Sequence, residues 1–205
     1  MTASSTITVK THNPQDSVVT SDRFGEGFAS FSEWMDSIEL NKEKFQMHYD
    51  EWEHDQTDID KVRQYVESKG IKALCIGEDW CPDVWRGLPV ISRIGELTGM
   101  EVRLFQRDEN SDIMDEFLKD GEFESIPVVV LYDADHNYLG HWIERADQAN
   151  AEMQPLLSML HGHERGSDEW QEARNNYLTK TVELAQGWRN AQVKEMLALL
   201  DEVYA

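Results

Sequence analysis

The segment 127–133, Pro-Val-Val-Val-Leu-Tyr-Asp, constrains the fold most, because it has the pattern of a strand without a polar face. A strand with one side in water alternates apolar and polar residues, whereas a nearly continuous apolar run is typical of a strand covered on both faces. Helices usually provide that cover in α/β proteins. The segment therefore predicts an α/β fold.

The neighbouring segments supply the other elements of such a fold. We expect strands at 72–76, 101–105 and 138–143, the last after a turn at 133–137, and helices at 82–97 and 111–121. The order strand, helix, strand, helix, strand, strand predicts a central mixed sheet of four or five strands. Its first strands are expected to be parallel, and its last two to form an antiparallel hairpin.

Helical patterns precede this core. Apolar residues at mostly helical spacing predict one helix over 27–49, and a polar loop follows at 53–58. Thr57 or Asp58 is expected to cap the next helix, which Gly70 ends. The polar residues before the first helix contain a β-branched run at 6–9, so they form either a loose arm or an edge strand.

Helical patterns also follow the core. One helix is expected from residue 146 to about residue 160, with Pro155 as a break or kink. A polar segment interrupts the pattern, and a long amphipathic stretch then runs over 170–203, with Gly187 weakening its middle. The expected organisation is a polar arm at 1–24, a helical extension at 25–69, the core at 70–160 and a second helical extension at 161–205.

The charge balance is strongly acidic, with 40 Asp and Glu residues against 19 Lys and Arg residues and a formal net charge of −21. Such a surface repels the phosphates of nucleic acids and of anionic membranes, so neither is expected as a partner. Neither a span of membrane length nor a signal-peptide pattern is visible. Two cysteines make no disulfide framework, and a cytoplasmic location is expected.

The segment Trp80-Cys81-Pro82-Asp83-Val84 carries the clearest chemistry. Pro82 suits the first position of a helix, which places Cys81 where free backbone N–H groups and the helix dipole favour a thiolate. Nearby charges act in both directions, three of them against the thiolate and one for it: Glu78, Asp79, Asp83 and Arg86. The sequence alone does not decide whether the pKa of the Cys81 thiol is raised or lowered, because burial also shifts the pKa of a thiol.

Together with two prolines, this segment makes residues 72–144 resemble the thioredoxin family. Residues 80–84 match the W-C-x-x-C signature of the family, with Val84 in place of the second cysteine. Pro89 falls where thioredoxins commonly carry a helix proline, and Ser125-Ile126-Pro127 is similar to their cis-proline turn. The resemblance implies a thioredoxin-like α/β fold, to which this chain adds N- and C-terminal helical extensions.

The resemblance also implies roles for individual residues. Cys81 would be the catalytic thiol, supported by Trp80, Pro82, Asp83 and Val84. Ile126 and Pro127 would position a bound peptide. Thioredoxins usually hold a buried acid where this chain has Cys75, which is expected to be an inert strand residue without a disulfide to Cys81.

The first functional hypothesis is a monothiol thiol–disulfide oxidoreductase. Val84 cannot resolve a mixed disulfide, so an external thiol such as glutathione would act as co-substrate, and no resident cofactor is expected. Its partners would be protein or small-molecule thiols and disulfides, and the helical extensions offer a surface for a homodimer. The main alternative treats Cys81 as an unreactive remnant in a redox-inactive binding module. A glutathione-transferase-like enzyme ranks last, because part of the helical material precedes the sheet.

A second cluster of polar residues, His161, His163 and Glu164, has the composition of a metal site. No further ligand stands at a suitable spacing, so the cluster is interpreted as a polar loop. No metal site is expected in this chain.

Overall fold

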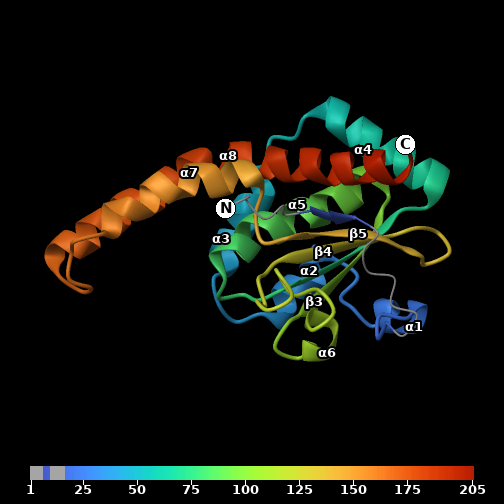
Figure 1. The fold of residues 1–205 in the computed structure, drawn as a ribbon, viewed down its shortest axis with the longest axis horizontal. Coiled ribbons are helices and arrows are strands. Elements are labelled where there is room, and N and C mark those ends of the chain that lie inside the picture. The colour runs from blue at the N-terminus through green and yellow to red at the C-terminus, as the bar shows by residue number, and fades with distance from the viewer. Residues whose placement is uncertain (1–6, 10–16) are drawn as a thin grey trace.

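The computed structural model describes residues 7–9 and 17–205 (Figure 1). The strands are β1 Ile7–Val9, β2 Lys72–Gly77, β3 Glu101–Gln106, β4 Val128–Tyr132 and β5 Tyr138–Ile143. The helices are α1 Ser21–Gly25, α2 Phe31–Ser37, α3 Lys42–Asp50, α4 Gln56–Lys69, α5 Pro82–Thr98, α6 Ser111–Met114, α7 Asp147–Leu157 and α8 Asp168–Val203, with a 3-10 turn at Ser158–Leu160.

Within the described residues, the strands form one five-stranded sheet in the order β1-β5-β4-β2-β3. Strand β2 is parallel to β3 and antiparallel to β4, and β4 and β5 form the expected antiparallel hairpin. All five residues of β4 are buried, as its apolar sequence predicts. Residues 7–9 pair with β5, so the edge-strand alternative is correct for them, and the remainder of residues 1–16 lies outside the described part.

Helices cover both faces of the sheet, which confirms the thioredoxin-like α/β fold. Helix α5 packs on β2 and β3, and α3, α4 and α8 pack against α5. Helices α4, α5 and α8 lie on one side of the sheet in Figure 1, and α1 and α6 lie on the other. Helix α8 also packs against β5 and against β1, which forms one edge of the sheet.

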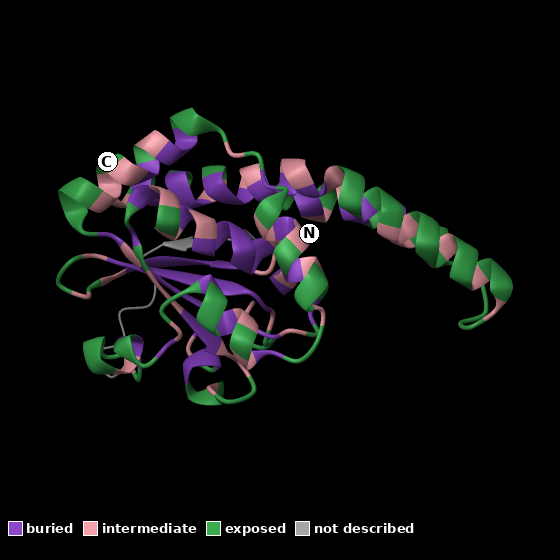
Figure 2. Ribbon diagram, turned by 180° about the vertical axis from the view of Figure 1, so that it is seen from behind, coloured by how far each residue is buried: buried purple, intermediate pink, exposed green. Residues whose placement is uncertain are grey.

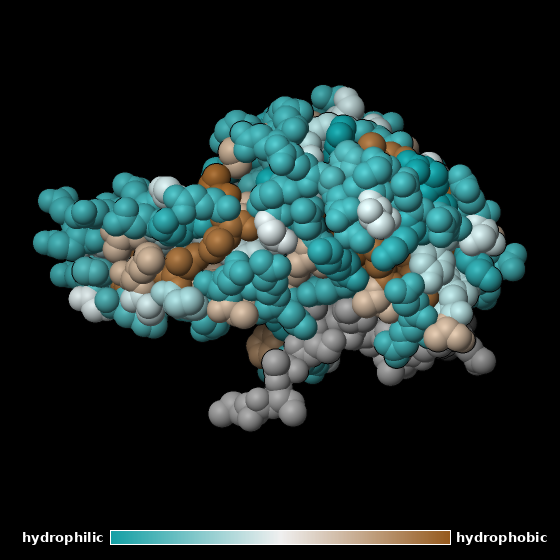
Figure 3. All heavy atoms as spheres, turned by 90° about the horizontal axis from the view of Figure 1, so that it is seen from above, coloured by the Kyte–Doolittle hydropathy of each residue, from teal (hydrophilic) through white to brown (hydrophobic). Residues whose placement is uncertain are grey.

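The α7–α8 hairpin projects from the body as an arm (Figures 1 and 2). At 1.5 Å per residue, the 36 residues of α8 span about 54 Å. A small apolar cluster of Ala149, Met153 and Trp188 joins α7 to α8, and apolar side chains continue in a row along the arm (brown in Figure 3). Helix α7 continues past Pro155 to Leu157, and α8 is uninterrupted at Gly187.

The single helix predicted over 27–49 is wrong, because the chain there forms α2 and α3 with a break at 38–41. The Asp79 carboxylate accepts hydrogen bonds from the backbone N–H groups of Glu39 (3.0 Å) and Leu40 (2.8 Å). Asn41 then takes a left-handed conformation, with φ of 58°, before α3 begins. The break therefore follows from a contact with a residue 40 positions away, which apolar spacing does not reveal.

Two other predicted boundaries also differ. Helix α4 begins at Gln56, inside the loop predicted at 53–58. Its cap is Asp55, which accepts a hydrogen bond from Thr57 N–H (2.8 Å), and neither Thr57 nor Asp58. The helix predicted over 111–121 stops at Met114. Gly121, with φ of 72°, belongs to a tight turn in which Lys119 and Phe123 pair, so it is a turn residue and does not end a helix.

Gly77, at the end of β2, lets α5 pack closely on the sheet. Val84 is fully buried, and a Cβ on Gly77 would lie 2.7 Å from Val84 Cγ1. We expect Gly77→Ala to lower the free energy of unfolding by at least about 1 kcal/mol, measured by urea denaturation, because overpacking forces neighbours to shift. Gly25→Ala is the control, since a Cβ there meets nothing within 4 Å. Equal stabilities of the two variants would contradict this close packing.

Candidate functional site

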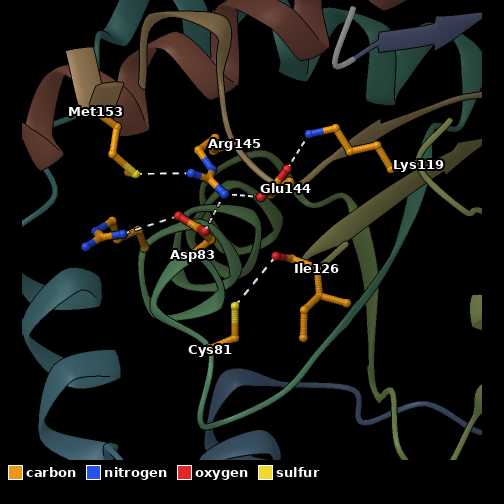
Figure 4. A network of polar contacts seen from close by, with 8 residues as sticks. Cys81, Asp83, Lys119, Ile126, Glu144, Arg145 and Met153 are labelled. Carbon is orange, nitrogen blue, oxygen red and sulfur yellow. Dashed lines mark hydrogen bonds and ion pairs between the residues drawn. The ribbon is translucent and has the colours of Figure 1, made fainter. Parts of the chain in front are cut away.

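The structure brings Cys81 and the Ile126–Pro127 turn together. Cys81 is the N-cap residue of α5, and Pro82 takes the first helical position. The Cys81 thiol points at the carbonyl oxygen of Ile126, with 3.7 Å between Sγ and O (Figure 4). The Ile126–Pro127 peptide bond is cis, as the resemblance implies. The Cys81 thiol and the cis-proline turn therefore face each other.

Burial decides the charge state that the sequence left open at Cys81. The residue is only 8% exposed, and this burial raises the pKa of its thiol above the ordinary value. The backbone N–H of Val84 and the charge of Arg145 act in the opposite direction, while Asp83 adds to the rise. At neutral pH the side chain is therefore mainly the protonated thiol.

The three hydrophobic neighbours of Cys81 have different environments. Trp80 is 45% exposed beside the thiol, and the guanidinium of Arg107 lies 5.1 Å from its ring centre. Trp85 is partly buried, and its Nε1–H donates to Asp79 O (2.6 Å). Val84 is buried in the first turn of α5. Trp80 is thus an exposed ring next to Cys81 in the chain, and Val84 is a packing residue.

Cys75 lies in β2 and is fully buried. Burial raises the pKa of its thiol far above the ordinary value. Both cysteines are free thiols in the structure, so Cys75 and Cys81 form no disulfide. Cys75 has the environment of an inert core residue.

Asp83 begins a charged network beside the thiol (Figure 4). Its carboxylate oxygens lie 3.2 Å from Arg86 and 3.2 Å from Arg145. Burial raises the pKa of Asp83 above its ordinary value, although both arginines lower it. Arg145 also donates to the sulfur of Met153 (3.1 Å). Asp83 therefore ties the start of α5 to the segment between β5 and α7.

Glu144 connects that segment to the cis-proline turn. Its backbone N–H donates to Pro127 O (2.7 Å), and its carboxylate pairs with Lys119 and Arg145. Burial alone would raise the pKa of Glu144, but the hydrogen bond from Lys119 and the charge of Arg145 bring it below the ordinary value. Glu144 has φ of 71°, a conformation that costs on the order of 1–3 kcal/mol outside glycine and that these contacts hold in place.

Gly87 allows α5 to approach the cis-proline. A Cβ on Gly87 would lie 3.1 Å from Pro127 Cγ. On the same side, Gln192 of α8 donates to Gly87 O (3.3 Å). The C-terminal helix therefore supports the part of α5 that packs behind the Pro127 ring.

Three residues beside Cys81 and Pro127 were not predicted from the sequence: Glu144, Arg145 and Gly87. A signal for Glu144 existed, because the predicted hairpin pairs the end of β5 with the start of β4 and so places residue 144 beside Pro127. The position of Arg145 follows from the same register. Gly87 carried no such signal, since its environment depends on how α8 packs.

In the part of the chain that the structure describes, no three His, Cys, Asp or Glu side chains gather to hold a metal ion. His161, His163 and Glu164 are exposed in the loop before α8. Over the same residues, every helix is too short or too polar to cross a bilayer.

Comparisons with known proteins place this chain in a family. No curated protein matches the chain. Two solved structures resemble it, each over 85% of this chain and 99% of the other: a protein of unknown function from Pseudomonas aeruginosa (18% identity, TM-score 0.46) and an HIV epitope scaffold (21% identity, TM-score 0.41). The family model described as Thioredoxin matches residues 28–158, which are more than half of the chain and include Cys81 and Pro127. The chain therefore belongs to the thioredoxin family.

Proposed function

We propose that the chain is a thiol–disulfide oxidoreductase that works with one thiol, that of Cys81, and an external thiol as co-substrate. The carrying observation is the position of Cys81 Sγ, 3.7 Å from Ile126 O at the cis-Pro127 turn and at the start of α5. A disulfide bound at this turn would lie next to the sulfur, and the N-terminal N–H groups of α5 favour the thiolate that attacks it.

The chemistry proceeds by thiol–disulfide exchange. The Cys81 thiolate attacks one sulfur of a substrate disulfide, a new S–S bond forms to Cys81, and the other substrate sulfur leaves as a thiolate. An external thiolate of the glutathione class then attacks the substrate sulfur and releases Cys81. A second external thiol frees the substrate sulfur, so that one disulfide is reduced and two external thiols become one disulfide.

Two exposed aromatic side chains support a polypeptide as the substrate. Trp80 and Phe123, 45% and 54% exposed, lie in the loops that precede Cys81 and Ile126. Arg107 connects these loops, because its guanidinium lies over the Trp80 ring and pairs with Glu124 (3.6 Å). An apolar side chain next to a cystine would find contact area on this rim.

Incubation of the folded protein with oxidised glutathione tests the proposal. We expect intact-mass spectrometry to detect one glutathione adduct, and peptide mapping to locate it at Cys81. Its formation should accelerate about tenfold per pH unit towards pH 9, because the raised pKa leaves little thiolate at neutral pH.

Cys81→Ser removes the reacting sulfur and should remain unmodified, while buried Cys75 reports any unfolding in both proteins. A wild-type protein that stays unmodified while folded at pH 9 would contradict the proposal.

A redox-inactive binding module is the second candidate. The low exposure of Cys81 and the presence of Val84 in place of a resolving cysteine favour it. In that case Cys81→Ser would retain full binding of a polypeptide partner, whereas an oxidoreductase would lose the covalent complex.

A further inference from the structure

A small cavity of about 20 Å³ lies where α5, α8 and the segment between β5 and α7 meet. One water molecule needs about 10–15 Å³ on this measure, so the cavity has room for slightly more than one water, such as a small anion of a few heavy atoms. Its charged lining consists of Arg86, Arg145, Arg189, Asp83 and Glu144. Three guanidinium groups against two carboxylates leave a net charge of +1, in a chain whose formal net charge is −21.

The two carboxylates already have cationic partners. Asp83 is paired with Arg86 and Arg145 at 3.2 Å each, and Glu144 is paired with Lys119 and Arg145. Of the three guanidinium groups in the lining, those of Arg86 and Arg145 each pair with a carboxylate, whereas that of Arg189 pairs with none. The excess positive charge of the lining is therefore located at Arg189.

Arg189 extends from α8 into the protein and is only 5% exposed. It donates to His48 Nδ1 (2.8 Å), His48 O (3.4 Å) and Gln186 Oε1 (3.1 Å), none of which carries a negative charge. Among residues 17–205, no carboxylate lies within ion-pair distance of this guanidinium. The charge of Glu51 acts on Arg189 from beyond ion-pair distance and offsets its burial only in part, so the pKa of Arg189 is lowered. A buried guanidinium without an ion-pair partner is unfavourable, because it loses hydration.

Two hydrogen-bond donors of the lining are also unused. The Nε–H groups of Arg189 and Arg145 are buried, and neither has an acceptor among the described residues. An anion accepts several N–H donors at once, and charge-assisted bonds of this type are stronger than those to neutral acceptors.

We propose that this cavity is a binding site for a small monoanion of the formate type, held by Arg189 and Arg145. One bound carboxylate balances the excess charge of the lining and accepts from the unused donors. The site requires no reaction at Cys81, so it goes beyond the proposed oxidoreductase function. Arg145 belongs to both sites, since it also pairs with Asp83 in the first turn of α5.

Binding of formate to the whole protein tests the inference. We expect ¹³C-formate to show line broadening in NMR that saturates with protein and is lost in Arg189→Gln. In thermal unfolding at constant ionic strength, formate at several times its Kd should raise the Tm of the wild type by about 2 °C or more. The Cys81→Ser protein should give the same results, which separates this site from the proposed redox function.

Salt alone stabilises an acidic protein by screening its charges. The test therefore depends on comparing the wild type with variants at the same ionic strength. Arg103→Gln is the matched control, because this partly exposed arginine pairs with Glu101 in β3, away from the cavity. It should bind formate like the wild type. Equal line widths, or equal Tm shifts, in the wild type and Arg189→Gln would overturn the proposal. Should Arg189→Gln unfold, wild-type formate broadening without saturation would overturn it as well.

Discussion

Cysteine in place of Val84 is expected to shorten the lifetime of a mixed disulfide at Cys81 at least about 10³-fold. Residue 84 lies in the first turn of α5, where its backbone N–H donates to Cys81 O (3.1 Å). A thiol there attacks the neighbouring disulfide within one molecule, at an effective concentration far above that of a millimolar external thiol. Cysteine is smaller than valine, so it fits the packing against Gly77.

The measurement starts from protein that carries one glutathione at Cys81. Release of glutathione is followed by mass spectrometry after transfer to thiol-free buffer. The wild type should retain its adduct, and Val84→Cys should lose it as an intramolecular disulfide forms. Val84→Ser is the control, because it changes the packing without supplying a sulfur. An adduct that persists equally in Val84→Cys would show that the side chain at position 84 does not reach the sulfur of Cys81.

Acidification from pH 7 to pH 5 is expected to destabilise the protein by about 2 kcal/mol through His48 alone. Burial, followed by the charges of Arg189 and Arg86, lowers the pKa of His48 from 6.5 to about 3. Between pH 6.5 and pH 3, His48 therefore binds a proton in the unfolded chain but stays neutral in the folded protein. Stability from the neutral imidazole is present above pH 6.5 and is lost progressively as the pH falls towards 3.

Urea denaturation of the wild type and His48→Gln at both pH values tests this expectation. Glutamine still offers Arg189 an acceptor oxygen but has no proton to bind, so the variant should lose about 2 kcal/mol less than the wild type on acidification. His163→Gln, at an exposed histidine in the loop before α8, should behave like the wild type. Equal losses in the wild type and His48→Gln would contradict the expectation.

The sequence was sufficient for those parts of the fold that depend on local pattern. The apolar run of β4, the strand–helix order and the Cys81-Pro82 start of α5 are properties of neighbouring residues, and each is found in the structure. The break at 38–41 is different, since it depends on Asp79, and no period in the sequence indicates an acceptor so distant along the chain. Regular spacing over 27–49 therefore gave one helix where there are two.

The candidate site also has parts that the local sequence predicts and parts that it does not. Cys81 and the Ile126–Pro127 turn were found because each is recognisable within a few residues. The direction of the pKa shift at Cys81 could not be predicted from the sequence, because it depends on how deeply the fold buries the sulfur. The contact between His48 and Arg189 joins residues 141 positions apart, and it exists only because α8 packs against α3. Side chains whose partners come from separate helices require the tertiary structure.

The projecting α7–α8 arm has a consequence for how the molecule moves through solution. A body with a rigid rod at one end experiences more friction than a sphere of equal mass, and it tumbles more slowly about its short axes than about its long one. Gel filtration calibrated with spherical standards would therefore overstate the mass and make a monomer resemble a dimer. The expected homodimer thus stays a prediction until light scattering or sedimentation equilibrium measures the molar mass independently of molecular shape.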